Sequence, residues 1–335
     1  MTKKLAINLE TSKIRSKFRK LRDDNKRLFN ENKILEGKIN SIQSDISFLR
    51  KVLMNHTWLN TLEENPDTYL SVACIAKNEG PYLKEWIEYH KILGVEKFYF
   101  YDNESTDNTK EILEPYINSG VVIYRFVEGK VMLIPVYQDA ILRARGQTRW
   151  LAIIDPDEFI VPIEKDSVTE FLKDYEQYPG VGINWICFDG YNHETKPTAH
   201  GGLVIANYTR VAKDHNLYGP DKCTKCIVNP NYVTYLNGPH NYYYTMDQTV
   251  TENYEPFSTY RTRFHSSQKI RINHYSRKSR EEYMKKINRG DPVHRQYANK
   301  KRFATHLFAT GVETSNDYTI QKYLPQLKAA MGIED

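Results

Sequence analysis

The sequence lacks any run of apolar residues long enough to cross a bilayer. A membrane helix needs about 20 such residues, and the longest candidates, such as 131–136, have the length of a buried strand. Lys3 and Lys4 resemble the start of a secretory signal, but the apolar stretch after them stops at Asn8. Four cysteines among 335 residues are too few for a disulfide scaffold. These scarcities lead us to expect a protein of the reducing cytoplasm.

The charge is distributed unevenly along the chain. Residues 1–60 hold 14 Lys and Arg against 6 Asp and Glu, a net charge of +8, which leaves the remaining residues at −3. Basic charge indicates an anionic partner, or a solvated helix face. Because the rest of the chain is negative, we expect no nucleic acid as partner. We expect instead that residues 1–27 contact an anionic membrane, although a purely structural role of this segment stays open.

Apolar residues recur every seven positions near the N-terminus. The first series is Ile14, Leu21, Leu28, Leu35, Ile42 and Leu49, and the second is Phe18, Asn25, Asn32, Ile39, Ile46 and Leu53. This repeat predicts a left-handed coiled coil, in which the paired Asn favour a parallel dimer while the flanking charges leave a trimer open. The alternative is a helix packed on its own domain. Pro66 ends the segment, so we predict a coiled-coil oligomerisation segment at 1–65 and a second domain at 66–335.

The second domain alternates between apolar strands and amphipathic helices. Predicted strands cover 69–76, 97–101, 121–126 and 150–154, with helices after the first three. This alternation predicts the α/β class, with a mainly parallel mixed sheet flanked by helices.

Polar side chains follow the predicted strands at the edge of the sheet where ligands bind. Asp155 and Asp157 come directly after the fourth strand and can point to the same side. Paired carboxylates can hold Mg²⁺ or Mn²⁺ together with a diphosphate, which would neutralise charge on a leaving group. The alternative is a turn in which the aspartates cap the backbone.

Five blocks, in order, resemble those of family 92 glycosyltransferases and their bacterial relatives. The blocks are Ala73–His90 (ACIAKNEGPYLKEWIEYH), Tyr101–Asp107 (YDNESTD), Asp155–Phe159 (DPDEF), 225–240 and 272–283. The resemblance covers about residues 70–290 and leaves the predicted coiled coil outside. It implies a GT-A fold, a nucleotide-sugar donor that is usually a UDP-sugar, and a divalent metal held by the Asp-x-Asp. In such a fold we expect a donor half at about 69–160 and an acceptor half with a C-terminal closing segment at about 161–335.

The resemblance also assigns roles to single residues. The expected metal ligands are Asp155, Asp157 and His274. The expected donor-binding residues are Lys77, Asn78, Asp102, Asp155, Lys225 and Lys278, and Arg277 and Lys286 would help to close over the diphosphate. An inverting transferase needs a carboxylate as general base, for which Asp189 and Glu194 are the candidates, although Asp189 departs from the family pattern.

These observations favour a metal-dependent glycosyltransferase that uses Mn²⁺ or Mg²⁺. It would move a hexose such as galactose from a UDP-sugar to a cell-surface glycan or lipid-linked oligosaccharide, with inversion, at the inner face of the cell membrane. Nucleotidyl transfer needs a Gly-rich loop after the first strand, and 77–80 contains too little glycine. The second hypothesis is a coiled-coil adaptor whose transferase domain is inactive.

Overall fold

The structure is a computed structural model that describes residues 17, 20–29, 31–33, 35–36, 66–190, 192–236, 238–245, 247–289 and 312–334. The described residues between 17 and 36 are helical, and Leu21, Leu28 and Leu35 of the predicted seam are 60%, 51% and 54% exposed. Exposed leucines at this spacing suit a helix that pairs with another helix. The other positions of the seam lie outside the described residues. The coiled coil and the boundary at residue 65 therefore stay predictions.

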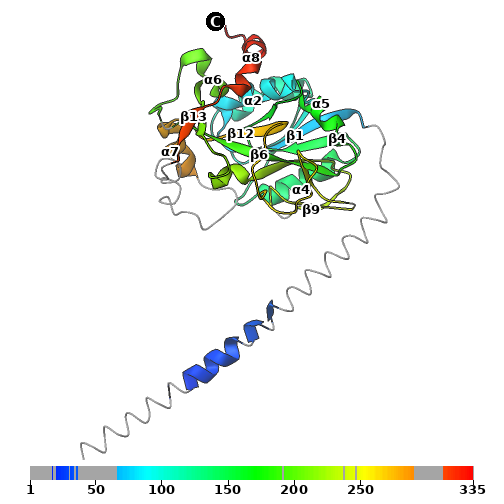
Figure 1. The fold of residues 1–335 in the computed structure, drawn as a ribbon, viewed down its shortest axis with the longest axis vertical. Coiled ribbons are helices and arrows are strands. Elements are labelled where there is room, and N and C mark those ends of the chain that lie inside the picture. Colours follow the sequence, from blue (N-terminus) through cyan, green and yellow to red (C-terminus); the bar gives the residue numbers. More distant parts are fainter. Residues whose placement is uncertain are drawn as a thin grey trace, which may run out of the picture. The chain divides into compact units, whose positions relative to one another are not determined.

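One mixed sheet forms the centre of the second domain (Figure 1). Its parallel part has the order β3-β2-β1-β4, formed by β1 (Thr68–Ala76), β2 (Lys97–Asp102), β3 (Val122–Phe126) and β4 (Thr148–Ile153). Beyond β4 the sheet continues through β8 (Thr224–Val228), β6 (Gly180–Asp189), β7 (Arg210–Ala212) and β13 (Thr314–Asn316). The junction between β4 and β8 is antiparallel. The predicted α/β class, with a mixed sheet flanked by helices, is confirmed, and its parallel part is β3-β2-β1-β4.

Helices cover both faces of this sheet because the central strands are apolar on both sides. On one face the core contains α2 (Gly80–Ile92), α3 (Thr109–Asn118), α5 (Val168–Lys173) and α8 (Leu324–Met331); on the other it contains α4 (Leu133–Ala144) and the hairpin of β9 (Val233–Leu236) and β10 (Tyr242–Tyr244). In β1, Leu70 and Val72 point to the first core while Ala73 and Ile75 point to the second. Figure 1 shows α2 and α4 on opposite sides of the sheet.

The remaining elements are short or lie at the ends of the sheet. They are α6 (Val204–Asn207), α7 (Arg280–Arg289), β11 (Val250–Thr251) and the 3₁₀ turns Ala199–Gly202, Gly219–Lys222 and Thr319–Tyr323. In the part of the chain that the structure describes, no helix is long and apolar enough to span a bilayer.

One additional strand pair positions the site. β12 (Ile270–Arg277) runs antiparallel to β5 (Glu158–Pro162) and parallel to β6. In this register His274 lies opposite Glu158, which follows β4 after a four-residue turn. Residues more than 100 positions apart in the sequence thus meet at the edge of the sheet where β4 ends.

His90 connects α2 to β5 through hydrogen bonds that require a neutral ring. Its Nδ1 lies 2.8 Å from the carbonyl oxygen of Trp86, and the N–H of Ile160 donates to its Nε2 at 3.3 Å. Since Nε2 accepts, Nδ1 carries the proton. Complete burial lowers the pKa of His90 to about 3, because the charged ring would lose its hydration.

We expect His90 to make the protein less stable in acid. A pKa lower in the folded than in the unfolded state means that the unfolded chain binds more protons below about pH 6.5. The free energy of unfolding should therefore fall by about 2 kcal/mol from this residue alone between pH 6.5 and 5. Urea denaturation at both pH values should show a smaller fall in His90→Gln. His200 is exposed, so His200→Asn should show the same fall in the free energy of unfolding as the wild type. An equal fall in all three proteins would contradict a lowered pKa of His90 as the cause.

Candidate functional site

A tight turn between β4 and β5 brings three carboxylates together. The Asp155 N–H donates to Glu158 Oε2 at 2.8 Å, and the Glu158 N–H donates to the Asp155 carbonyl at 3.0 Å. The side chain of Asp155 is 31% exposed, whereas those of Asp157 and Glu158 are 5% and 0% exposed. Three acidic groups so close to each other need positive partners, because isolated buried carboxylates are costly.

Lys225 supplies one of these partners from β8. Its Nζ lies 2.9 Å from Asp155 Oδ2 and 3.5 Å from Glu158 Oε2, and its side chain is 1% exposed. Tyr137 donates to the other oxygen of Asp155 at 2.9 Å. Burial alone would lower the pKa of Lys225, but Asp155 and Glu158 raise it above its usual value. Burial would likewise raise the pKa of Asp155, and Lys225 holds it below its ordinary value. Lys225 and Asp155 are thus charged.

Glu158 differs from its two neighbours in the direction of its pKa. Burial, which exceeds the attraction of Lys225, raises the pKa of Glu158 well above its usual value. Its Oε1 has no hydrogen-bond partner among the described residues. Glu158 therefore keeps its proton to a higher pH than Asp155 does.

Asp157 has a separate set of partners. Lys286 of α7 donates to its Oδ2, and His274 Nε2 lies 3.6 Å from its Oδ1. Burial would raise the pKa of Asp157, but Lys286 and His274 hold it well below its usual value. The ring of Trp185 packs on His274 with centroids 4.4 Å apart. The carboxylate is therefore charged although it is almost fully buried, and Lys286 covers it on the side on which α7 lies.

The side chains at this turn suit a divalent cation in part. Asp157 Oδ1 and His274 Nε2 are close enough to bind one ion, and His274 Nδ1 has no partner among the described residues. Within that same part of the chain, no three His, Cys, Asp or Glu side chains form a ready metal cluster. Two protein ligands suit Mg²⁺ or Mn²⁺ when diphosphate oxygens and water complete the coordination.

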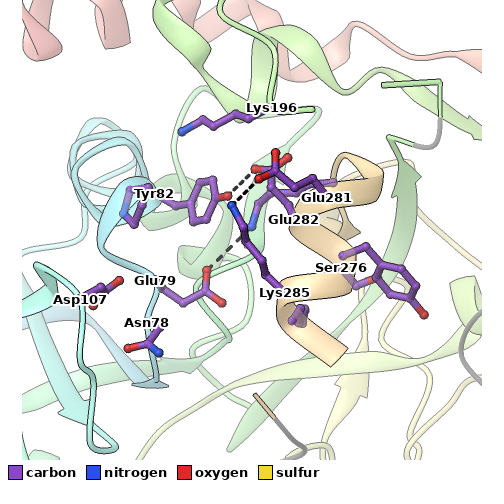
Figure 2. Close-up of a pocket in the computed structure, with 13 residues that line it drawn as sticks. Asn78, Glu79, Tyr82, Asp107, Lys196, Ser276, Glu281, Glu282 and Lys285 are labelled. Atoms are coloured by element: carbon purple, nitrogen blue, oxygen red, sulfur yellow. Dashed lines mark hydrogen bonds and ion pairs between the residues drawn. The ribbon is translucent and has the colours of Figure 1, made fainter. Parts of the chain in front are cut away.

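A cavity of about 420 Å³ lies beside this turn. Figure 2 shows side chains of α2 and of α7 facing each other across it, with Lys196 at one side. Its lining is Asn78, Glu79, Pro81, Tyr82, Asp107, Lys196, Ser276, Lys278, Glu281, Glu282, Tyr283, Lys285 and Lys286. Lys286 belongs to the lining and also binds Asp157, so this side chain connects the cavity to the acidic turn.

Tyr82 organises the cationic side of the cavity. Its ring lies 3.7 Å from Lys278 Nζ and 4.7 Å from Lys196 Nζ, and its hydroxyl donates to Glu282. Lys278 Nζ is also 3.8 Å from the buried carboxylate of Glu79. The face of an aromatic ring attracts cations, so Lys278 and Lys196 form the side of the cavity that an anion can contact, although the whole lining contains as many carboxylates as lysines.

The structure places the predicted donor-binding residues in three surroundings. Asn78 and Lys278 line the cavity. Lys77 is 37% exposed and lies 3.6 Å from Glu104. Asp102 is buried, and its carboxylate accepts from the Ser105 N–H and the Tyr124 hydroxyl, both at 2.8 Å.

The two candidates for the general base, Asp189 and Glu194, differ in their exposure. Asp189 ends β6 and is 3% exposed. Glu194 is 75% exposed and forms an ion pair with Arg280 at 3.2 Å.

The cavity also contains Glu79, Tyr82 and Lys285, for which the sequence predicted no role. Glu79 directly follows Asn78 after β1, a position that could have been noticed, whereas Lys285 depends on how α7 packs.

The sequence is similar to those of known glycosyltransferases. The sequence pattern of glycosyltransferase family 92 matches residues 70–306. A family 92 protein of Ricinus communis is 36% identical over 91 residues, which are 27% of this chain and 16% of the relative. A β-1,4-galactosyltransferase of Caenorhabditis elegans is 24% identical over 227 residues, which are 64% of this chain and 49% of the relative. This chain thus spans at most about half the length of these two relatives.

A solved structure of S. aureus TarS in complex with UDP is also similar. It is 15% identical, has a TM-score of 0.30, and covers 49% of this chain and 47% of its own.

Proposed function

The chain belongs to glycosyltransferase family 92, and from this premise we propose that it transfers a hexose from a UDP-sugar in a reaction that depends on Mn²⁺ or Mg²⁺. The observation that carries the proposal is the cavity with four lysines in its lining, joined to the acidic turn through Lys286, which lines the cavity and binds Asp157. Galactose is the proposed hexose, because one similar protein is named a β-1,4-galactosyltransferase.

The donor would lie in the cavity with its diphosphate against the lysines. Lys278 and Lys286 would form charge-assisted hydrogen bonds with phosphate oxygens, which are stronger than neutral ones. Asn78 lies at the end of β1, where the nucleoside would sit in a GT-A fold, and Lys77 and Asp102 stay proposed neighbours of that nucleoside. Asp155, Asp157 and His274 would hold the metal ion, which would neutralise charge on the leaving diphosphate.

The acceptor would be a cell-surface glycan or a lipid-linked oligosaccharide. For inversion, a carboxylate has to take the proton of the attacking hydroxyl while that hydroxyl replaces the diphosphate. Glu194 is exposed and can reach an incoming acceptor, whereas Asp189 is buried at the end of β6. Both stay our candidates for the base.

The N-terminal segment would assemble the enzyme and keep it near its acceptor. We propose a dimer or trimer through the heptads and a contact of the basic residues 1–27 with anionic lipid at the cytoplasmic face of the membrane.

Calorimetric titration of UDP into the purified chain, with Mn²⁺ and with EDTA, tests this function. We expect binding that is much stronger with the metal than with EDTA, and binding about tenfold weaker or worse in Lys278→Met, because a charged hydrogen bond to phosphate is lost. Lys173→Met, on the exposed side of α5, is the matched control and should bind like the wild type. Melting temperatures show whether each variant is folded. If no nucleotide binds under either condition, the transferase proposal fails and the adaptor hypothesis replaces it.

A further inference from the structure

Two loops that are far apart in the sequence are joined into one surface, which we name the loop platform. It consists of residues 214–222 and 259–266. The Thr262 N–H donates to the Lys222 carbonyl at 2.9 Å, and the His265 N–H donates to Asn216 Oδ1 at 2.9 Å. The backbone of Arg261 forms an antiparallel β-bridge with Cys223, the residue that directly follows the first loop. These contacts hold the two loops side by side.

The loop platform exposes large apolar side chains. Leu217 is 78% exposed, Phe264 is 65% exposed and Tyr260 is 53% exposed. Single exposed apolar residues are common, but several on one small surface indicate a binding site. Leu217 is the most exposed large apolar residue of the described part. An aliphatic side chain standing in water suits a hydrocarbon partner better than a sugar ring.

Arginines accompany these apolar groups. The Arg261 guanidinium lies 5.3 Å from the ring centre of Tyr260, and that of Arg263 lies 5.2 Å from the ring centre of Phe264. Both arginines are exposed. Cations beside exposed aromatic and aliphatic groups are typical of proteins that insert into the interface of an anionic bilayer.

The acidic residues of the loop platform do not cancel this charge. Asp221 is completely buried, and its two oxygens accept from the Cys187 N–H and pair with His215 Nδ1 at 2.8 and 2.7 Å. Asp214 is exposed, and its Oδ1 accepts from the backbone N–H groups of Asn216 and Leu217. Two exposed arginines thus stand against one exposed carboxylate, and the solvent-facing surface is apolar with a net positive charge.

We propose that the loop platform binds the surface of an anionic phospholipid bilayer, with Leu217 and Phe264 in the interface and Arg261 and Arg263 at the lipid phosphates. The first loop leads directly into β8, which delivers Lys225 to Asp155. This contact is separate from the basic N-terminal segment. Bilayer binding does not depend on the proposed transferase activity. Presentation of a lipid-linked acceptor to the site does rest on it.

Vesicle sedimentation with the full chain tests the proposal. Phosphatidylcholine vesicles with 30% phosphatidylglycerol should bind the wild type, and Leu217→Ser/Phe264→Ser should bind at least about tenfold more weakly. Arg261→Gln/Arg263→Gln should weaken binding and reduce its dependence on salt. Phe126→Ser, 55% exposed in β3, and Lys110→Gln/Lys173→Gln are the matched controls and should bind like the wild type. Residues 1–60 are themselves basic and can bind anionic vesicles without the loop platform. Equal binding by the wild type and the loop variants would show that this segment alone binds the vesicles, and it overturns the proposal.

A fluorescence measurement locates the contact. In Phe264→Trp, the emission should shift to shorter wavelength with the anionic vesicles and be quenched by brominated lipid, whereas Phe126→Trp should do neither. Absence of quenching in Phe264→Trp overturns the proposal. A shift that depends on protein concentration without lipid also overturns it, and would show a contact between copies of this chain. UDP binding should be unchanged in all these variants, which separates failure of this proposal from failure of the proposed function.

Discussion

Asp157→Asn is expected to abolish the metal-dependent part of UDP binding. The substitution keeps the shape of the side chain but removes the charge that Lys286 and His274 face. A neutral amide oxygen is a poor ligand for Mg²⁺ or Mn²⁺ compared with a carboxylate. We expect UDP affinity with Mn²⁺ to fall by about a hundredfold, to the level found with EDTA. Titration calorimetry with Mn²⁺ and with EDTA measures both values.

The metal-independent part of UDP binding provides an internal control. Lys286 loses its acidic partner in Asp157→Asn and remains in the lining of the cavity, so binding in EDTA should stay equal or become slightly stronger. Asp174→Asn removes an exposed carboxylate that lies 3.6 Å from Lys165, and should bind UDP like the wild type. If Mn²⁺ still strengthens UDP binding in Asp157→Asn, this carboxylate is not a ligand.

The central sheet was predictable because each of its parallel strands can be recognised from a short stretch of sequence. β1 and β4 are nearly continuous apolar runs, and β1 is followed by a Pro at the start of a helix, so strand and helix could be read from short windows. The predicted strand at 69–76 differs from β1 by one residue at its start. The position of Asp155 and Asp157 after a strand followed from the same pattern.

The electrostatic pairing could not be predicted in the same way. Lys225 meets Asp155 because β8 runs antiparallel to β4, and Lys286 meets Asp157 because α7 packs across β12. Neither arrangement has a local sequence signal. His274 was placed near the metal by family resemblance, and the register of β12 against β5 supplies the physical reason why it lies there. Its role as a ligand is still a prediction.

Lys225→Met is expected to have the largest effect on stability. The ammonium group is 1% exposed, and its removal leaves Asp155 and Glu158 together without that cation. Removing one member of a buried ion pair costs about 3–5 kcal/mol, because the remaining acidic groups lose their cation in a poorly hydrated site. Urea denaturation at pH 8 should show a loss of this size. Lys165→Met, at an exposed ion pair with Asp174, should cost less than about 0.5 kcal/mol.

The pH dependence distinguishes a lost charge from a lost side chain. Without Lys225, the pKa of Glu158, which burial already raises, can only rise further, because the cation that lowered it is gone. A carboxyl group with a raised pKa binds protons in the folded state that the unfolded chain does not bind, so stability increases as the pH falls. The deficit of Lys225→Met should therefore be smaller at pH 5.5 than at pH 8. It should also shrink in Lys225→Met/Glu158→Gln, since one of the two carboxylates is then neutral. An equal deficit at both pH values and in both variants would show that Lys225 acts by packing, and that the acidic turn does not need its charge.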